Sequence, residues 1–488
     1  MSIKITGTRP KKRTKIVATI GPASNNEETL RQMILAGLDV VRINFSHGKH
    51  EDLIETIGLI KKLRKEMNVP IAIMGDLRGP RIRVGEIEGG SVTLKEGQKL
   101  ILTPQEVLGN SERVSISYPD LAHDVVPGSL LLLDDGNIEI EVAKIEADGN
   151  IVGRVIEASD LSSRRGLNLP GRRVNLPSIT EKDFADVDFA IEHEFDFLAL
   201  SFVQSADDVR LLNALLAAKK SKIPVIAKIE RKNALDDIDN IVKEAYGVMV
   251  ARGDLALEMS IQEVPIAQKR IIAACRRASI PVITATQMLE SMIEMHKPTR
   301  AEATDVANAV LDGTDALMLS GETAIGAYPA QTIAMMSSIA MKAEQAWING
   351  ELSGPSPLPS PDGIDANVAY VAQIAAGSLH AKAIIIHTTT GGTARRVACH
   401  RPEIPILGLS SYPESRRRLA LTWGVESVLV EFIKGTEHMV SMAFQQVISK
   451  GLADPGDLIV ITAGTPYGAA GRTNLLKVEE IPPTYGDE

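Results

Sequence analysis

Two short segments near the middle of the chain carry residues that could transfer a charged group. The apolar run PVIAKIE ends in Lys228 and Glu230, and side chains two positions apart on a strand point to the same face. The next apolar run, GVMVARGD, ends in Gly253 and Asp254. Adjacent strands would bring an ammonium and two carboxylates to one edge, where the carboxylates suit Mg²⁺ and the glycine amide suits an anion. For this segment alone, a structural salt bridge is the simpler explanation.

Most other apolar runs in the first two-thirds of the chain also end in polar residues. In barrels of parallel strands, the active site is built where the strands end. So many polar groups at one rim favour a catalytic site over a purely stabilising set of charges. The residues at these other strand ends are Arg42, Asn44, Ser46, Asp76, Ser201, Thr286 and Glu322.

Eight strand-like runs, with helical segments between most of them, would position these residues. The helical spacing of apolar residues is clear at Glu27–Ala36, His50–Glu66 and Ala206–Ala218. Eight strands that alternate with helices predict a (β/α)8 barrel, an α/β fold. The eight runs are residues 15–21, 39–46, 70–76, 195–202, 224–230, 247–254, 281–286 and 315–322.

Two regions depart from this alternation. Between Asp76 and about Arg173, short alternating runs and Asp-Gly turns predict a small β-barrel domain, inserted after the third strand and acting as a lid. A Pro/Ser-rich linker then precedes strands and helices that are typical of a parallel α/β domain. The predicted units are residues 1–76 and 174–345 for the catalytic barrel, 77–173 for the lid, 346–364 for the linker and 365–488 for a C-terminal regulatory domain.

The composition excludes several classes of protein. Of the 488 residues, 44% are hydrophobic but only 3% are aromatic, so small and aliphatic side chains must fill the core, as in α/β packing. The formal net charge of −9 argues against nucleic acid or an anionic membrane as a partner. Cys275 and Cys399 offer no disulfide framework, and no apolar run is long enough to span a bilayer. We therefore expect a cytoplasmic enzyme.

Several long strings in the barrel region resemble the pyruvate kinase family. The resemblance implies transfer of the phosphoryl group of phosphoenolpyruvate to ADP, which gives ATP and pyruvate in the last step of glycolysis. It also implies a homotetramer, and domain order and lengths fit the family. The strings are VRINFSHG at 41–48, LPSITEKD at 176–183, AKIE at 227–230, VARGDL at 250–255, ITATQMLESM at 283–292 and PTRAEATDVANAVLDGTDALMLSGET at 298–323.

The resemblance implies roles for the residues at the strand ends. Lys228 would neutralise the transferring group, Arg42 would pair with its oxygens, and Thr286 would support protonation of the enolate through water. Glu230 and Asp254 would hold Mg²⁺ or Mn²⁺. The residues implied to bind the substrate are Arg42, Ser201, Lys228, Gly253, Asp254 and Thr286.

A monovalent cation and a nucleotide are implied as well. Taken singly, Ser46 could instead cap a helix and His47 could be a loop residue. Arg81 departs from the family pattern, because many K⁺-dependent relatives have glutamate there, and we expect K⁺ to be dispensable. The implied cation ligands are Asn44, Ser46, Asp76 and the carbonyl of Leu77, and the implied nucleotide residues are Asn44, His47, Arg83 and, from the lid, Arg165.

The C-terminal domain contains a second candidate site. The string HTTTGGTARR places hydroxyls and glycines between a strand and a helix start, which favours an anion, although an ordinary strand-to-helix turn has the same pattern. The resemblance implies that a phosphorylated allosteric effector binds here. The predicted effector residues are Thr388, Thr389, Thr390, Gly391, Gly392 and Thr393.

The residues are compatible with two other functions. Another Mg²⁺-dependent barrel enzyme that acts on phosphoenolpyruvate or a pyruvate enolate, such as an aldolase or a mutase, would leave the inserted and C-terminal domains unexplained. A regulatory relative without catalysis would have lost Lys228, Glu230 or Asp254, and all three are present.

Overall fold

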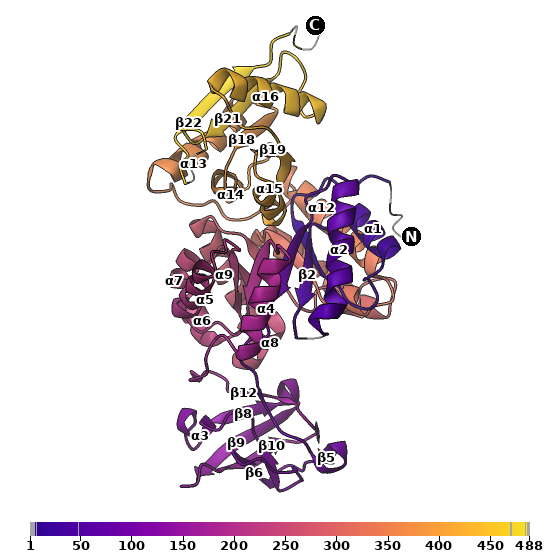
Figure 1. Cartoon of the computed structure of the whole chain (residues 1–488), viewed down its shortest axis with the longest axis vertical. Helices are drawn as coiled ribbons and strands as arrows, with labels where there is room; N and C mark the ends of the chain where they lie inside the picture. The colour runs from indigo at the N-terminus through magenta and orange to yellow at the C-terminus, as the bar shows by residue number, and fades with distance from the viewer. Residues whose placement is uncertain (1–4, 6, 47, 469–470, 484, 486–488) are drawn as a thin grey trace.

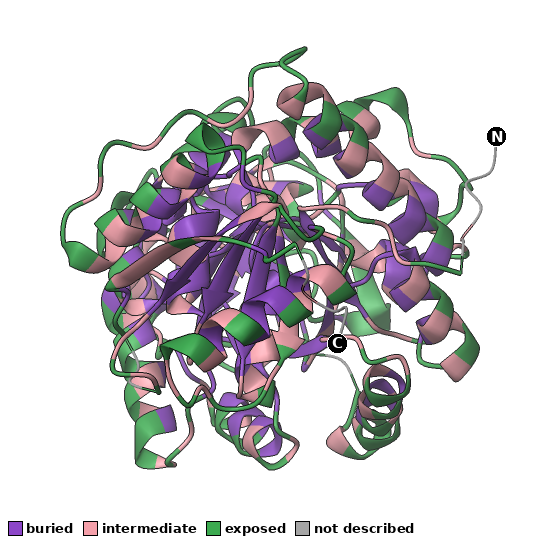
Figure 2. Cartoon of the chain, turned by 90° about the horizontal axis from the view of Figure 1, so that it is seen from above, coloured by how far each residue is buried: buried purple, intermediate pink, exposed green. Residues whose placement is uncertain are grey.

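The computed structural model describes residues 5, 7–46, 48–468, 471–483 and 485, and a closed barrel of eight parallel strands forms its centre (Figure 1). Around the barrel the order is β1-β17-β16-β15-β14-β13-β3-β2, so the (β/α)8 prediction is confirmed. Figure 2 shows the buried strands enclosed by helices whose outer faces are exposed. The strands are β1 (Lys15–Thr19), β2 (Val40–Asn44), β3 (Ala72–Asp76), β13 (Phe197–Leu200), β14 (Val225–Ile229), β15 (Gly247–Ala251), β16 (Val282–Ala285) and β17 (Ala316–Leu319).

Local signals in the sequence begin and end the helices around this barrel. Asn26 caps α1 by accepting a hydrogen bond from the amide of Thr29, and Gly37 ends it at a φ of 117°. Thr299 and Glu302 form a capping box at the start of α10. The helices are α1 (Glu27–Ala36), α2 (His50–Glu66), α4 (Glu181–Glu192), α5 (Ala206–Ala218), α6 (Lys232–Asp236), α7 (Ile238–Glu244), α8 (Arg252–Glu258), α9 (Val264–Ala278), α10 (Arg300–Asp312), α11 (Gly321–Ala324) and α12 (Pro329–Ile348), with a 3-10 turn η3 (Glu290–Ile293).

The segment inserted between β3 and α4 forms two sheets over a core of its own. The larger sheet has the order β4-β12-β8-β9-β10-β6-β7, and a bridge between Val84 and Ile116 joins its two ends. β5 pairs with β11 in the smaller sheet. The elements are β4 (Ile82–Arg83), η1 (Glu88–Gly90), β5 (Ser91–Thr93), β6 (Lys99–Thr103), β7 (Arg113–Ser115), α3 (Leu121–Asp124), β8 (Leu130–Leu133), η2 (Asp134–Gly136), β9 (Ile138–Ile145), β10 (Ile151–Glu157), β11 (Asp160–Ser162) and β12 (Gly166–Asn168).

The C-terminal domain is an α/β sheet of order β20-β19-β18-β21-β22. Its first four strands are parallel as expected, whereas β22 pairs antiparallel with β21 and was not predicted. α12 continues to Ile348, into the expected linker, because no helix breaker occurs before Gly350. The elements are α13 (Ile364–Ser378), β18 (Ala383–His387), α14 (Gly392–Ala398), β19 (Ile406–Ser410), α15 (Pro413–Arg418), η4 (Leu419–Leu421), β20 (Val425–Leu429), α16 (Thr436–Ser449), β21 (Leu458–Ala463) and β22 (Leu475–Glu480).

The inserted domain and the C-terminal domain lie at opposite ends of the barrel (Figure 1). Where the C-terminal domain meets the barrel, Arg401 of that domain forms a buried ion pair with Asp315 of the barrel at 3.0 Å, and Arg276 of the barrel donates to the carbonyl of Cys399. One end of the barrel therefore faces the inserted domain, and the other end faces the C-terminal domain (Figure 1). Among the described residues, no helix is long and apolar enough to cross a membrane.

Candidate active site

A cavity at the C-terminal ends of β2, β3, β13 and β14 and at the start of α8 gathers most of the residues expected at the rim. Arg78, Arg81 and Phe202 also line it. These side chains come from segments far apart in sequence, and the parallel barrel brings them to one place. The predicted site residues in its lining are Arg42, Asn44, Ser46, Asp76, Leu77, Arg83, Ser201, Lys228, Glu230 and Asp254.

Lys228 is the buried cation at the centre of this cavity. Its Nζ donates to Ser201 Oγ at 2.7 Å and lies 2.9 Å from Glu230 Oε1 and 3.3 Å from Asp76 Oδ1. Burial would lower the pKa of Lys228, but the charges of Asp76 and Glu230 outweigh it and raise the pKa above the usual range of lysine. The side chain is therefore a fixed ammonium.

Asp76 neutralises two cations in this structure. Besides Lys228, it binds the guanidinium of Arg42 at 2.6 Å, and Arg42 also donates to Thr19 Oγ1 at 2.8 Å. Burial alone would raise the pKa of Asp76, but Arg42 and Lys228 lower it, so the carboxylate stays ionised. Both cations expected to meet a phosphoryl group are thus held by a carboxylate of the barrel.

Glu230 and Asp254 are the carboxylates expected to hold a divalent cation. Glu230 is 2% exposed and accepts a hydrogen bond from the amide of Phe202 at 2.6 Å. Burial raises the pKa of Glu230, Lys228 opposes the rise and the charge of Asp254 adds to it. A cation would relieve the repulsion, so this pair fits Mg²⁺, which takes few protein ligands. Within the described part of the chain, no group of three or more His, Cys, Asp or Glu residues could hold a metal.

The residues expected around a monovalent cation and a nucleotide are only partly gathered here. Asn44, Ser46, Asp76 and Leu77 all line the cavity, although Asn44 Oδ1 accepts from the amide of Ser46 and the Leu77 carbonyl accepts from Ser201 Oγ. Arg83 also lines it, whereas Arg165 pairs with Asp134 of the inserted domain at 3.1 Å and lies outside the lining. His47 lies outside the described residues.

Thr286 and Gly253 bind each other beside the cavity. The amide of Gly253 donates to Thr286 Oγ1 at 2.8 Å, and the hydroxyl donates to the carbonyl of Ala285 at 2.6 Å. The amide expected to bind a substrate carboxylate is thus engaged by the threonine. Thr286 has a φ of 70°, which is strained for a β-branched residue and is typical of functional loops.

Arg252 holds Thr286 in this strained conformation, and sequence reasoning assigned it no role. Its guanidinium donates to the carbonyls of Thr286 at 2.6 Å and Ala285 at 3.2 Å, and it pairs with Asp305 at 2.7 Å. The only signal in the sequence was the position of Arg252 at a strand end, two residues before Asp254. Glu322, by contrast, accepts from the amides of Leu289 and Ser320 and pins a loop.

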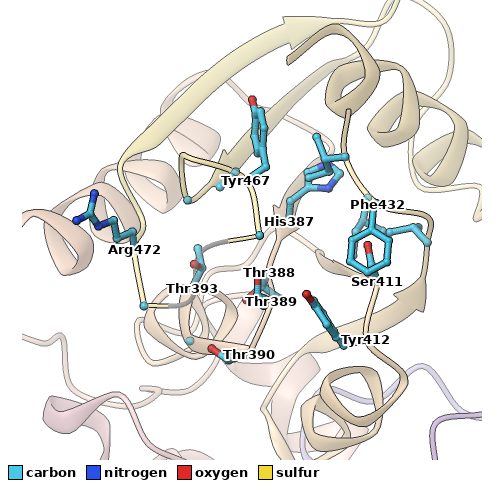
Figure 3. A pocket seen from close by; sticks show the side chains of 18 of the residues that line it. His387, Thr388, Thr389, Thr390, Thr393, Ser411, Tyr412, Phe432, Tyr467 and Arg472 are labelled. Carbon is cyan, nitrogen blue, oxygen red and sulfur yellow. The ribbon is translucent and has the colours of Figure 1, made fainter. Parts of the chain in front are cut away.

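The C-terminal domain contains a separate pocket beyond the end of β18 (Figure 3). Gly391 is absent from its lining, although its amide donates to Thr388 Oγ1 at 3.0 Å and shapes the turn. Tyr412, Phe432 and Tyr467 add aromatic surface. The other predicted effector residues all line the pocket, namely Thr388, Thr389, Thr390, Gly392 and Thr393.

Positive charge and an unpaired imidazole distinguish this pocket from an ordinary turn. α14 has only seven residues, too few for its N-terminus alone to form an anion site. The positive charge of the pocket comes from the side chains of Arg396 and Arg472, which line it. His387 is 4% exposed, and its Nε2 has no hydrogen-bond partner among the described residues. Burial lowers the pKa of His387 to about 4, so the ring is neutral. The pocket can thus offer cations and hydroxyls to an anion, and one neutral imidazole lies in its lining.

The barrel cavity suits phosphoryl transfer, because that reaction depends on positioning and on neutralising charge over three oxygens. Its fixed ammonium, its paired carboxylates and its arginines lie where barrel enzymes carry out their chemistry. Fold and cavity together define a class, the phosphotransferases built on a (β/α)8 barrel.

Comparisons with known proteins narrow this class to one family. Residues 11–333 match the pyruvate kinase barrel domain, and residues 366–479 match the pyruvate kinase alpha/beta domain. A pyruvate kinase of Geobacillus stearothermophilus is 45% identical over 477 residues, which cover 96% of this chain and 81% of that protein. Pyruvate kinase 2 of Synechocystis is 44% identical over 478 residues, with coverages of 97% and 80%. The crystal structure of a pyruvate kinase from Cryptosporidium parvum matches with a TM-score of 0.90 and 39% identity, over 97% of both chains.

The chain belongs to the pyruvate kinase family. As a member, it is a phosphotransferase that moves the phosphoryl group of phosphoenolpyruvate to ADP and gives ATP and pyruvate in glycolysis. The matches cover the C-terminal domain as well as the barrel. They therefore favour this activity over the aldolase-like and mutase-like alternatives and over a relative without catalysis.

We predict that Arg252→Gln slows proton exchange at the methyl group of pyruvate by roughly 10- to 100-fold, because the resemblance implies that Thr286 supports this step and a small displacement of such a group has effects of this size. The substitution removes the donors that hold the Thr286 carbonyl. The measurement is tritium or deuterium exchange into pyruvate, compared with phosphoryl transfer. Arg252→Lys, which keeps the charge without the planar fork, should fall between wild type and Gln. Equal loss in both reactions would contradict a specific effect on Thr286.

Proposed function

We propose that Lys228, Arg42 and Thr286 are the catalytic residues of this reaction. The observation that carries the proposal is the buried ammonium of Lys228, bonded to Ser201 and Asp76 at the barrel rim. A fixed, buried charge stabilises the negative charge on the transferring oxygens. Arg42 adds a second cation, which exchanges its bond to Asp76 for phosphate oxygens when substrate binds.

Substrate binding and protonation use neighbouring groups. Glu230 and Asp254 hold Mg²⁺ or Mn²⁺, which supplies positive charge to the substrate oxygens when bound. The substrate carboxylate takes the amide of Gly253, and the hydroxyl of Thr286, released from that amide, orients a water that protonates the enolate. The proposed substrate-binding residues are Arg42, Ser201, Lys228, Gly253, Asp254 and Thr286.

The nucleotide and a monovalent cation bind in and beside the same cavity in this proposal. Arg165 reaches the nucleotide after it leaves Asp134, to which it is now paired. The place of all four expected ligands in the lining supports a K⁺ site, which Arg81 makes dispensable. The nucleotide residues are Asn44, His47, Arg83 and Arg165, and the cation ligands are Asn44, Ser46, Asp76 and the Leu77 carbonyl.

We propose that the protein is a cytoplasmic homotetramer and that each subunit consists of three domains with separate roles. Cys275 and Cys399 are both free and buried, which is compatible with a reducing compartment. The insertion acts as a lid, because a domain inserted after a barrel strand projects over the catalytic rim. The proposed bounds are 1–76 and 174–345 for the barrel, 77–173 for the lid, 346–364 for the linker and 365–488 for the regulatory domain.

One assay tests the proposed reaction and its cofactor together. Purified protein is given phosphoenolpyruvate, and pyruvate and ATP are measured with ADP or Mg²⁺ omitted in turn. We expect the two products in equal amounts, and neither without ADP or without the metal. Pyruvate formed without ADP would indicate hydrolysis or another reaction of the enolate, and would contradict the proposal.

We further propose that the C-terminal pocket binds a phosphorylated metabolite, such as a sugar monophosphate or AMP, which activates the enzyme. Arg396 and Arg472 supply positive charge, and the threonines of the β18–α14 turn supply hydroxyls. Binding there lowers the phosphoenolpyruvate concentration needed for half the maximal rate. A coupling of roughly 1–3 kcal/mol is usual between two such sites.

Thr390→Glu should abolish this activation, because a carboxylate would occupy the position of the phosphate. Thr390 is exposed, so the longer side chain should leave the core of the C-terminal domain unaffected. The measurements are calorimetric binding of AMP and of sugar monophosphates, and the half-saturating phosphoenolpyruvate concentration with and without them. Thr390→Gln, which is similar in size and uncharged, is the matched control and should keep part of the response. Persistent activation by every phosphorylated metabolite in the Glu variant would place the site elsewhere.

A further inference from the structure

The short helix α15 connects the C-terminal pocket to the underside of the barrel. Tyr412, just before the helix, lines the pocket. One turn later, Ser415 Oγ donates to the carbonyl of Thr389, which also lines the pocket, at 2.6 Å. The start of α15 is therefore bonded to the backbone that an anion in the pocket would contact.

The end of α15 carries three consecutive arginines, and each one reaches a segment just before a barrel strand. Arg416 donates to the side chain and the carbonyl of Asn68, at 3.1 and 2.8 Å. Arg417 donates to Asp196 Oδ1 at 2.6 Å. Arg418 donates to the backbone carbonyl of Lys222, at 3.0 Å. The strands that follow these segments are β3, β13 and β14.

These three strands are neighbours in the barrel, and they carry the central polar group of the active site at their other ends. The barrel order places β13 between β14 and β3. β3 ends at Asp76, β13 leads into Ser201 and β14 carries Lys228. The Ser201 hydroxyl lies 2.7 Å from the Lys228 ammonium and 3.3 Å from the Asp76 carboxylate. The same three strands thus join the arginines of α15 to the catalytic ammonium.

Among the three contacts, the ion pair between Arg417 and Asp196 should contribute most to the coupling, because the other two arginines bond to neutral groups. Asp196 is 1% exposed, and its second oxygen accepts from the amide of Ile73, so it ties β13 to β3. Burial raises the pKa of Asp196 although Arg417 opposes this, so the carboxylate depends on its cation. Arg64 lies 3.6 Å away and would partly compensate when Arg417 is replaced.

We propose that α15 couples the C-terminal pocket to the catalytic rim, and that Arg417 is a positioning residue, which acts on Ser201 and Lys228 through Asp196. A displacement of the Thr389 backbone moves α15 and alters the position of three adjacent strands together. The activation by a phosphorylated ligand rests on the proposed effector site, whereas the link between pocket and rim does not. By linkage, substrate at the rim must alter the pocket as well.

The test measures the effect of substrate binding at the catalytic rim on the C-terminal pocket, because this measurement needs no effector. Hydrogen exchange of the backbone amides at 388–393 is measured in the full-length protein with and without phosphoenolpyruvate and Mg²⁺, and with no ADP. We expect exchange in the wild type to change on binding, the change to be lost in Arg417→Gln, and part of it to remain in Arg417→Lys. Lys450→Gln is the matched control, because Lys450 pairs with Glu426 inside the C-terminal domain, at 2.5 Å, and should respond like wild type.

Steady-state kinetics separate positioning from loss of fold. In Arg417→Gln we expect the half-saturating phosphoenolpyruvate concentration to rise and kcat to fall, each several-fold, and Arg417→Lys to restore part of both, whereas a merely structural defect would lower the amount of folded protein and the Tm without this partial rescue. Ser415→Ala, which removes the hydroxyl at the other end of α15, should weaken the exchange response if Arg417→Gln does not fold. A wild type without an exchange response, or a folded Gln variant that keeps it, would overturn the link. An intact link without binding of any phosphorylated metabolite would overturn only the effector proposal.

Discussion

Lys228→Met is expected to slow phosphoryl transfer by at least about a thousandfold, because it removes the buried charge that faces the developing negative charge. Arg42 does not take its place, because it extends from a different strand, β2, and is proposed to bind the phosphoryl oxygens from its own position. The fold should survive, because Asp76 keeps Arg42 as its cation. The measurement is the rate of ATP formation at saturating substrates, with the Tm recorded for both proteins.

Exchange of the methyl protons of pyruvate, measured in the same Lys228→Met protein, is the internal control for this prediction. Exchange depends on the metal and on Thr286 more than on Lys228, so it should persist in the variant. Lys219→Met makes the same substitution at a lysine whose partner, Asp188, is exposed, and it should leave the rate unaltered. Near-normal turnover of Lys228→Met would remove the role proposed for this lysine.

Arg81→Glu is expected to create a K⁺ requirement that the wild type lacks. Arg81 lines the same cavity as the residues of the proposed cation site, and its guanidinium carries a positive charge there. A unit charge at about 4 Å contributes about 4 kcal/mol at an effective dielectric constant of ~20, and partial exposure reduces this. We therefore expect the variant to lose roughly 10- to 100-fold in K⁺-free buffer and to recover when K⁺ is added.

The inserted domain modifies this effect. Arg81 donates to Asp135 of that domain at 2.7 Å, so part of its charge is neutralised in this structure. Asp135→Asn, which leaves the charge of Arg81 unpaired, should therefore keep full activity without K⁺, in contrast to Arg81→Glu. Rates are measured with an organic cation as counterion, with and without K⁺. A wild-type enzyme that is inert until K⁺ is added would show that Arg81 does not replace the ion.

The barrel could be predicted from the sequence because its strands are continuous apolar runs separated by capped helices. The expected helices at Glu27–Ala36, His50–Glu66 and Ala206–Ala218 coincide with α1, α2 and α5. Strand β22 was missed, because Leu475–Glu480 alternates weakly and its pairing with β21 is set by tertiary context. Hydrophobic periodicity is thus a better predictor of elements that bury a whole face than of edge strands.

The residues of the barrel cavity could be predicted from their places at strand ends, but their bonding could not. Nothing in the sequence indicates that Asp76 binds both Arg42 and Lys228, since the three lie on different strands. The same holds for the bond between Gly253 and Thr286, which depends on an unusual backbone conformation. Contacts between distant segments are set by the packed fold and leave no local pattern.

Because the inserted domain separates β3 from β13, closure of the barrel joins segments that are far apart along the chain. Ile73 and Asp196 hydrogen-bond across these neighbouring strands although they are 123 positions apart. Joining the ends of so long a loop costs chain entropy, and contacts at large separation form slowly. The inserted sheets pack around their own core, separate from that of the barrel. Once that core forms, it holds the two strand ends near each other, so the barrel loses much less entropy on closure than the length of the insertion implies.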